Sequence, residues 1–227
     1  MSIVPSRLTI QYLRRTPSAI LLFVQLAGIV LYPWMEKSPI GRVFLTSFGL
    51  VVLGVALRVV RKSPQATWLG FLLAILVVLL FGVSVFAPHP ALPVATATLE
   101  AAFYFYAATG LITYMMQDYV ATADELFAAG ATFTLLVWAF AYVYVVCQAI
   151  APGSFSAPVN PDGQRTWMEL LFLSVAVLSG VGLSDILPVT PFARALVMLE
   201  AFSGVMYIAV VVSRLVALTV LAGREKR

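Results

Sequence analysis

A short apolar segment followed by two glycines constrains the fold of this 227-residue chain more than any other feature. Residues 167–178 are mostly apolar, but a helix needs about 20 such residues to cross a bilayer, so this segment is too short. The run SGVGLSD at 179–185 follows directly and is unsuited to a regular helix. Irregular backbone at membrane depth is tolerated only where it is buried in protein or lines a water-filled cavity. We therefore predict a re-entrant hairpin, in which a short helix enters the membrane and an extended strand returns.

Signals at both ends of the hairpin support this prediction. Thr166 and Glu169 form a T-x-x-E capping box, which satisfies the first free amides of a helix. Pro188 and Pro191 interrupt regular structure after the glycines, and a long apolar helix is predicted from Pro191 onward. The carboxyl end of a half-helix carries partial negative charge, and a strand with two glycines can direct carbonyl oxygens at one axis. Both features favour a dehydrated cation.

Residues 167–218 resemble the pore domain of tetrameric P-loop cation channels, of the bacterial potassium-channel type. The family filter reads T-V-G-Y-G-D followed by I-x-P, and this chain has GVGLSD at 180–185 followed by ILP. The matches that flank the filter are PVTPFAR at 188–194, Leu199-Glu200, Gly204 and SRLV at 213–216.

The resemblance implies a selectivity filter and its ion-binding residues, which would be Gly180, Val181, Gly182, Leu183, Ser184 and Asp185. Gly180 stands where the family has a threonine whose hydroxyl lines the innermost ion site, and Leu183 replaces a bracing tyrosine. Ser184 replaces a glycine, and a positive φ there would cost about 1–2 kcal/mol. The permeant ion is K⁺ or Na⁺, and these departures leave the choice open.

Three residues outside the filter are candidates for supporting roles. Glu200 is an acid within an apolar span, and it either braces the filter from behind or pairs with Arg194. Gly204, beside Ser203, is a gating-hinge candidate, because Gly/Ser pairs are recognised kink sites. Close helix packing explains the same glycine equally well. The sequence does not decide between these two interpretations.

Composition predicts an all-α membrane protein, since 62% of the residues are hydrophobic and 11% are charged. We expect six transmembrane helices plus the re-entrant pore helix and filter loop. The spans are predicted at about 17–35, 43–60, 66–87, 95–117, 123–149 and 191–220. Pro88, Pro90 and Pro93 are expected to close the third span. Residues 1–120 would form a four-helix peripheral domain, which is voltage-sensor-like but charge-poor, and residues 121–227 the pore domain.

The distribution of basic residues predicts the topology. Arg7, Arg14, Arg15, Arg58, Arg61, Lys62, Arg224, Lys226 and Arg227 would share one face with both termini, which places the termini in the cytoplasm of a multi-pass protein in the inner or plasma membrane. The fourth span has no basic residues, so we expect weak or absent voltage gating. Arg214, deep in the last span, is interpreted as reaching the cytoplasmic interface, with a gate charge in the pore as the alternative.

The sequence excludes several other classes of function. Phosphate-loop, zinc-ligand and catalytic-triad patterns do not occur, so we expect no enzyme, no cofactor and no metal beyond the permeant monovalent cation. The single cysteine, Cys147, precludes an internal disulfide, and the net charge of +4 reflects topology better than nucleic-acid binding. Glu100, an acid in the fourth span, is either a functional residue or an interfacial side chain that reaches the lipid headgroups.

A cation-conducting, potassium-channel-like homotetramer in contact with membrane lipids is the leading interpretation. The pore element occurs once, so four copies must come from four chains. Two alternatives remain: a secondary transporter with one broken helix, and a non-conducting, channel-like membrane subunit.

Overall fold

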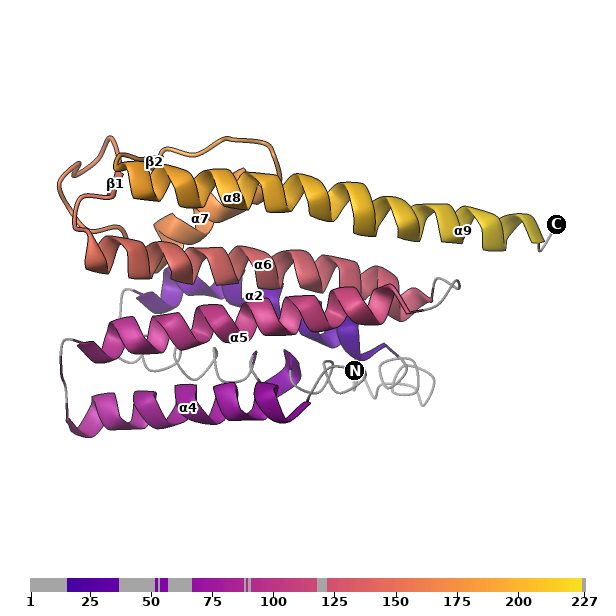
Figure 1. Cartoon of the computed structure of the whole chain (residues 1–227), viewed down its shortest axis with the longest axis horizontal. Helices are drawn as coiled ribbons and strands as arrows, with labels where there is room; N and C mark the ends of the chain where they lie inside the picture. Colours follow the sequence, from indigo (N-terminus) through magenta and orange to yellow (C-terminus); the bar gives the residue numbers. More distant parts are fainter. Residues whose placement is uncertain are drawn as a thin grey trace, which may run out of the picture.

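The computed structural model describes residues 16–36, 52, 54–56, 67–87, 89, 91–117 and 122–225, which are mostly helical (Figure 1). The helices are α2 (Pro17–Glu36), α4 (Thr67–Phe86), α5 (Ala91–Met115), α6 (Ala123–Ile150), α7 (Trp167–Leu178), α8 (Pro191–Tyr207) and α9 (Ser213–Glu225). A π-helical turn, η1 (Ile208–Val212), joins α8 to α9, and two short strands, β1 (Phe155–Ser156) and β2 (Leu187–Pro188), flank α7 in the sequence.

The predicted spans are confirmed only in part. Three helical stretches are long and apolar enough to cross a membrane, at Pro17–Trp34, Ala123–Ile150 and Pro191–Val220. Helices α4 and α5 lie where spans were predicted, but the apolar stretch of α4, Trp68–Ser84, is shorter. The span predicted at 43–60 falls outside the described residues except at 52 and 54–56, which are helical.

Helix α5 begins earlier than predicted, and Pro93 lies within its first turn instead of helping to close the third span. A proline is tolerated there because the amides of the first turn have no partner within the helix. The prediction for Pro93 was therefore wrong.

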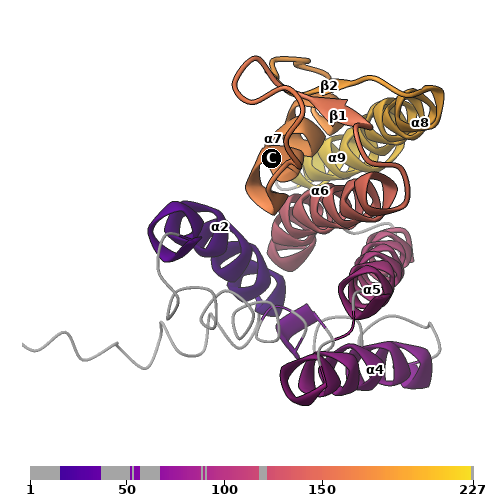
Figure 2. The ribbon, with the colours of Figure 1, turned by 90° about the vertical axis from the view of Figure 1, so that its left-hand side faces the viewer.

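Helix α6 is the centre of the arrangement and packs against α2, α5, α7 and α8, while α4 packs on the far side of α5 (Figures 1 and 2). Small side chains bring the helices close: Ala128 and Ala131 on α6 are fully buried, and Gly130 faces Leu22 of α2. Large rings fill the space between α5 and α6, where Tyr104 packs edge-on against Trp138 at a centroid distance of 5.6 Å.

The chain reverses direction after α7. Figure 1 shows the segment that follows α7 running back along α8 to β2. Strand β2 pairs antiparallel with β1, with Phe155 opposite Pro188, so the returning chain ends beside the segment that leads into α7. The return over 179–186 consists of turns and irregular backbone, which differs from the predicted extended strand.

Candidate functional site

The start of α7 is capped as predicted. The Thr166 side chain accepts a hydrogen bond from the Glu169 amide at 3.3 Å, and the Glu169 carboxylate accepts one from the Thr166 amide at 2.6 Å. The same reciprocal pair forms at the start of α6 between Thr122 and Glu125. Each box satisfies two amides that would otherwise lack partners, so the sequence itself fixes where both helices begin.

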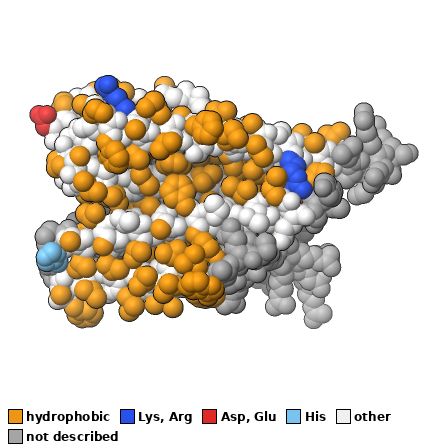
Figure 3. Space-filling view, viewed as in Figure 1, with side chains coloured by type: hydrophobic (Ala, Val, Ile, Leu, Met, Phe, Trp, Pro, Cys, Tyr) orange, Lys and Arg blue, Asp and Glu red, His pale blue; other side chains and the backbone are white. Residues whose placement is uncertain are grey.

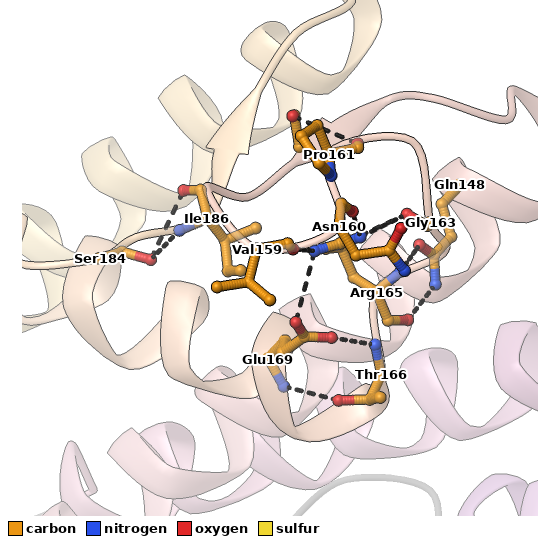
Figure 4. A network of polar contacts seen from close by, with 11 residues as sticks. Gln148, Val159, Asn160, Pro161, Gly163, Arg165, Thr166, Glu169, Ser184 and Ile186 are labelled. Atoms are coloured by element: carbon orange, nitrogen blue, oxygen red, sulfur yellow. Dashed lines mark hydrogen bonds and ion pairs between the residues drawn. The ribbon is translucent and has the colours of Figure 1, made fainter.

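A buried arginine organises the connection between α6 and α7 (Figure 4). The Arg165 guanidinium donates to the carbonyl oxygens of Val159 at 3.3 Å and Gly163 at 2.7 Å. It also forms an ion pair with Glu169 at 3.4 Å. The Gln148 side chain pairs with both backbone groups of Arg165, at 2.8 and 3.0 Å. The loop is therefore tied to the end of α6 and to the first turn of α7.

The end of α7 explains one departure from the filter pattern. Gly180 has a φ of +73°, and its amide donates to the Val177 carbonyl at 3.0 Å. Gly182 has a φ of +69°, and its amide donates to the Ala176 carbonyl at 2.8 Å. A left-handed residue just after a helix is commonly glycine, because a Cβ is strained in that conformation. The glycine at position 180 is therefore suited to ending α7, where a threonine would be strained.

Ser184 does not carry the backbone strain considered for it. Its φ is not positive, and its side chain accepts a hydrogen bond from the Ile186 amide at 3.1 Å. A glycine is therefore not needed at this position.

The loop that follows α7 lies on the surface of the chain. Val181 and Leu183 are 71% and 75% exposed, and Gly180, Gly182 and Asp185 are also exposed. The Leu183 side chain therefore packs little against its own chain. In the resembled family this position holds a tyrosine that braces the filter. The loop is held instead at its two ends. The Gly180 and Gly182 amides bond to the last turn of α7, and β2 pairs with β1.

Glu200 on α8 is fully buried and joins this helix to α6 and α7. Its carboxylate is hydrogen-bonded to the Tyr144 hydroxyl on α6 and to the Ser174 hydroxyl on α7. The Ser174 hydroxyl also lies 2.9 Å from the Val137 carbonyl oxygen on α6. The sequence did not indicate Tyr144 and Ser174 as partners of Glu200. Their hydrogen bonds to Glu200 depend on how α6, α7 and α8 pack, which no local pattern reveals.

Arg194 does not pair with Glu200. Its Nε donates to the Pro188 carbonyl oxygen at 3.2 Å, on the exposed side of the first turn of α8. Of the two interpretations of Glu200, pairing with Arg194 is wrong, because the Glu200 carboxylate contacts Tyr144 and Ser174 instead. Support of the loop by Glu200 stays a prediction.

Gly204 is where α8 passes directly over the end of α7. A Cβ built on Gly204 would lie 2.1 Å from the Leu178 carbonyl oxygen and 2.8 Å from its carbonyl carbon. This contact gives the packing interpretation of the glycine a direct structural basis. The interruption of regular helix lies further along, in η1.

An apolar face of α8 borders the loop. Its exposed members are 60–65% accessible to solvent: Phe192, Met198, Leu199, Phe202 and Val205. The space-filling view shows hydrophobic side chains over most of one face of the molecule, with charged side chains toward the two ends (Figure 3). Such a face requires lipid or protein around it.

Part of the chain matches a known protein family. Residues 131–220, which include α7, its loop and α8, match a family model described as ion channel. Neither the curated proteins nor the solved structures give a significant match to the chain. The matched segment supports an ion channel in the membrane.

Proposed function

We propose that the chain assembles as a homotetramer in which the loop 179–185 lines a pathway for monovalent cations. The ion channel match supports the broad class. The observation that carries the proposal is the hairpin: a 12-residue helix, too short to cross a bilayer, followed by a loop that returns to β1. Non-helical backbone of this kind at membrane depth has to be covered by protein or water.

The cation path follows from the polar groups of the loop. Ions enter past Asp185, which is exposed, and lose water to carbonyl oxygens of Gly180, Val181, Gly182 and Leu183. The carboxyl end of α7 adds a partial negative charge near these oxygens. A buried Glu200 holds α7 in place through Ser174.

A fourfold arrangement would cover apolar side chains that are exposed in a single chain. The exposed side chains of Val181 and Leu183, together with the apolar face of α8, would be covered by neighbouring copies. Rings of backbone carbonyls need several copies around one axis, and this chain has one such loop. The outer segments of the protein would contact membrane lipids.

The peripheral helices complete the proposed architecture. Residues 1–120 would form a charge-poor peripheral domain without voltage sensing, and residues 121–227 the pore domain, with both termini cytoplasmic. K⁺ is the first candidate ion, and the changed positions 180, 183 and 184 predict weaker discrimination against Na⁺ than an unaltered filter would give.

Reconstitution of the purified protein in liposomes tests the function. We expect rapid K⁺ flux, weak dependence on voltage, and a reversal potential between K⁺ and Na⁺ solutions that reports the selectivity. Saturable exchange of a solute would indicate a transporter, and the absence of flux would indicate a non-conducting subunit. A cross-linking ladder in native membranes that ends at four copies tests the assembly independently.

A further inference from the structure

Aromatic rings from α2, α5, α6 and α7 form one cluster beside the start of α7. The Trp167 ring packs against Tyr32 and Trp138 at centroid distances of 5.1 and 5.5 Å. The Tyr142 ring lies 5.8 Å from both Trp167 and Tyr104. Trp167 is the first residue of α7, and Tyr32 lies near the end of α2. The cluster is therefore close to helix ends, the depth at which tryptophan and tyrosine are enriched around lipid headgroups.

Glu100 adds a carboxylate to this aromatic cluster. It lies one turn before Tyr104 on α5, and its side chain is hydrogen-bonded to Tyr142 on α6. Glu100 is partly buried, and no basic side chain of the described residues forms an ion pair with it. A carboxylate beside aromatic rings attracts a cationic group, because the faces of the rings are also negative.

The two indoles of the cluster carry hydrogen-bond donors that the chain does not satisfy. The Nε1 atoms of Trp138 and Trp167 are buried, and neither has a partner among the residues that the structure describes. Trp138 as a whole is 3% exposed. A buried donor without a partner costs about 1–3 kcal/mol, and buried polar groups in native proteins almost always have one. The indoles therefore indicate an acceptor that comes from another molecule.

We propose that the aromatic cluster binds the headgroup of phosphatidylethanolamine, a zwitterionic phospholipid. The primary ammonium of the headgroup pairs with Glu100 and lies against the rings. The phosphate and ester oxygens accept hydrogen bonds from the indoles of Trp138 and Trp167. Of the two interpretations of Glu100, this proposal favours the side chain that reaches the lipid headgroups.

The charge of the site decides which lipid it takes. An anionic phospholipid such as phosphatidylglycerol offers the same oxygen acceptors, but it lacks the ammonium and adds negative charge beside Glu100. The site requires only a membrane around these helices, so the proposal goes beyond the cation pathway and does not depend on it.

Lipid binding to the full-length protein in detergent, measured by native mass spectrometry, tests the site. We expect the parent to bind phosphatidylethanolamine at least about fivefold more tightly than phosphatidylglycerol with the same acyl chains, because the ammonium adds a charge-assisted hydrogen bond. Glu100→Gln should abolish this preference. Asp162→Asn, which removes an exposed acid outside the cluster, should keep it. Equal affinity of the parent for the two lipids, or an unchanged preference in Glu100→Gln, overturns the proposal.

The indoles provide a second measurement, which still decides the matter if Glu100→Gln fails to fold. Trp167→Phe keeps an aromatic ring but removes the donor, so it should lower the affinity for both lipids by at least about twofold. Trp68→Phe is the matched control, because Trp68 is 67% exposed and lies in the first turn of α4. Equal affinities in Trp167→Phe and the parent would contradict the assigned role of the indoles.

Free phosphoethanolamine distinguishes the lipid from a soluble ligand with the same headgroup chemistry. It should not displace phosphatidylethanolamine, because it lacks the acyl chains that add apolar contact. Displacement at equal concentration would overturn the assignment to a lipid. Lipid preference without cation flux in liposomes would overturn only the proposed function, whereas flux without lipid preference would overturn only this site.

Discussion

Gly204 and Leu178 bring the backbones of α8 and α7 into direct contact, with the Leu178 carbonyl oxygen 2.1 Å from where a Cβ on Gly204 would stand. Because the obstacle is backbone, a side chain cannot move aside to admit a methyl group. The first prediction follows from this contact.

Gly204→Ala should separate α7 from α8 and destabilise the protein by about 1–3 kcal/mol, the usual cost of overpacking. The measurement is thermal unfolding of the purified protein in detergent. Gly82→Ala is the control, since Gly82 also lies in a helix but has nothing within 4 Å of a built Cβ. That control should be neutral or stabilising by up to about 1 kcal/mol. Equal effects of the two substitutions would contradict the packing role.

The buried hydrogen bonds of Glu200 predict coupled effects. Tyr144→Phe and Ser174→Ala should each lower the free energy of unfolding by about 1–3 kcal/mol, because each leaves a buried carboxyl oxygen of Glu200 without its hydrogen-bond donor. The double variant should depart from the sum of the single effects by at least about 0.5 kcal/mol, since both hydroxyls bind one carboxylate. Ser203→Ala, which removes an exposed hydroxyl bonded within α8, is the control. Strict additivity in thermal unfolding would show that the two bonds act independently.

The capping box at the start of α7 predicts a loss of stability when Thr166 is replaced. Thr166→Ala removes the side-chain acceptor for the Glu169 amide and should destabilise the protein by about 1 kcal/mol. Thr98→Ala provides a comparison on α5, where the exposed hydroxyl bonds a carbonyl within the helix. That substitution should have little effect on the unfolding temperature. A larger loss from Thr98→Ala than from Thr166→Ala would be inconsistent with the capping role.

The left-handed conformation of Gly182 predicts a functional loss without a steric clash. A built Cβ has nothing within 4 Å, so the strain of Gly182→Ala, about 1–2 kcal/mol, comes from the backbone conformation alone. Under the proposed function, K⁺ flux should fall strongly or the K⁺-to-Na⁺ ratio should change. Val181→Ala shortens an exposed neighbour without adding this strain and should have the smaller effect. Wild-type flux and selectivity in Gly182→Ala would exclude the loop from the pathway.

The exposed carboxylate of Asp185 predicts a salt-dependent effect. Asp185→Asn should lower cation flux at low ionic strength, and the difference should shrink above about 0.1 M salt, where the screening length is about 10 Å. Asp162→Asn, which removes an exposed charge elsewhere in the connection between α6 and α7, is the control. An equal reduction of cation flux in both variants would indicate an effect of general surface charge instead of a local effect of Asp185 where ions enter.

Local signals in the sequence predicted the helix starts well. The T-x-x-E box at Thr166 forms as expected, and the same pair forms between Thr122 and Glu125, because a capping box depends only on residues three apart. The length of α7 and the interruption after Leu178 were also visible in the sequence, as a short apolar run followed by glycines.

Features that depend on distant contacts were not predictable in the same way. Gly204 could be assigned to packing only once Leu178 was located beside it. Arg214 meets the end of α5, 99 residues earlier in the chain, which neither sequence interpretation anticipated. The prolines were also ambiguous, since Pro93 can either end a loop or stand in the first turn of a helix.

The exposure of Val181 and Leu183 has a consequence for cells that contain two versions of the gene. If four loops share one axis, each copy completes the surroundings of its neighbours, and one altered copy degrades the whole ring. With equal amounts of normal and altered chains mixing at random, only about one tetramer in sixteen would be free of the alteration. A variant of this loop should therefore be dominant over the normal chain, whereas a variant that prevents folding should only reduce the number of rings.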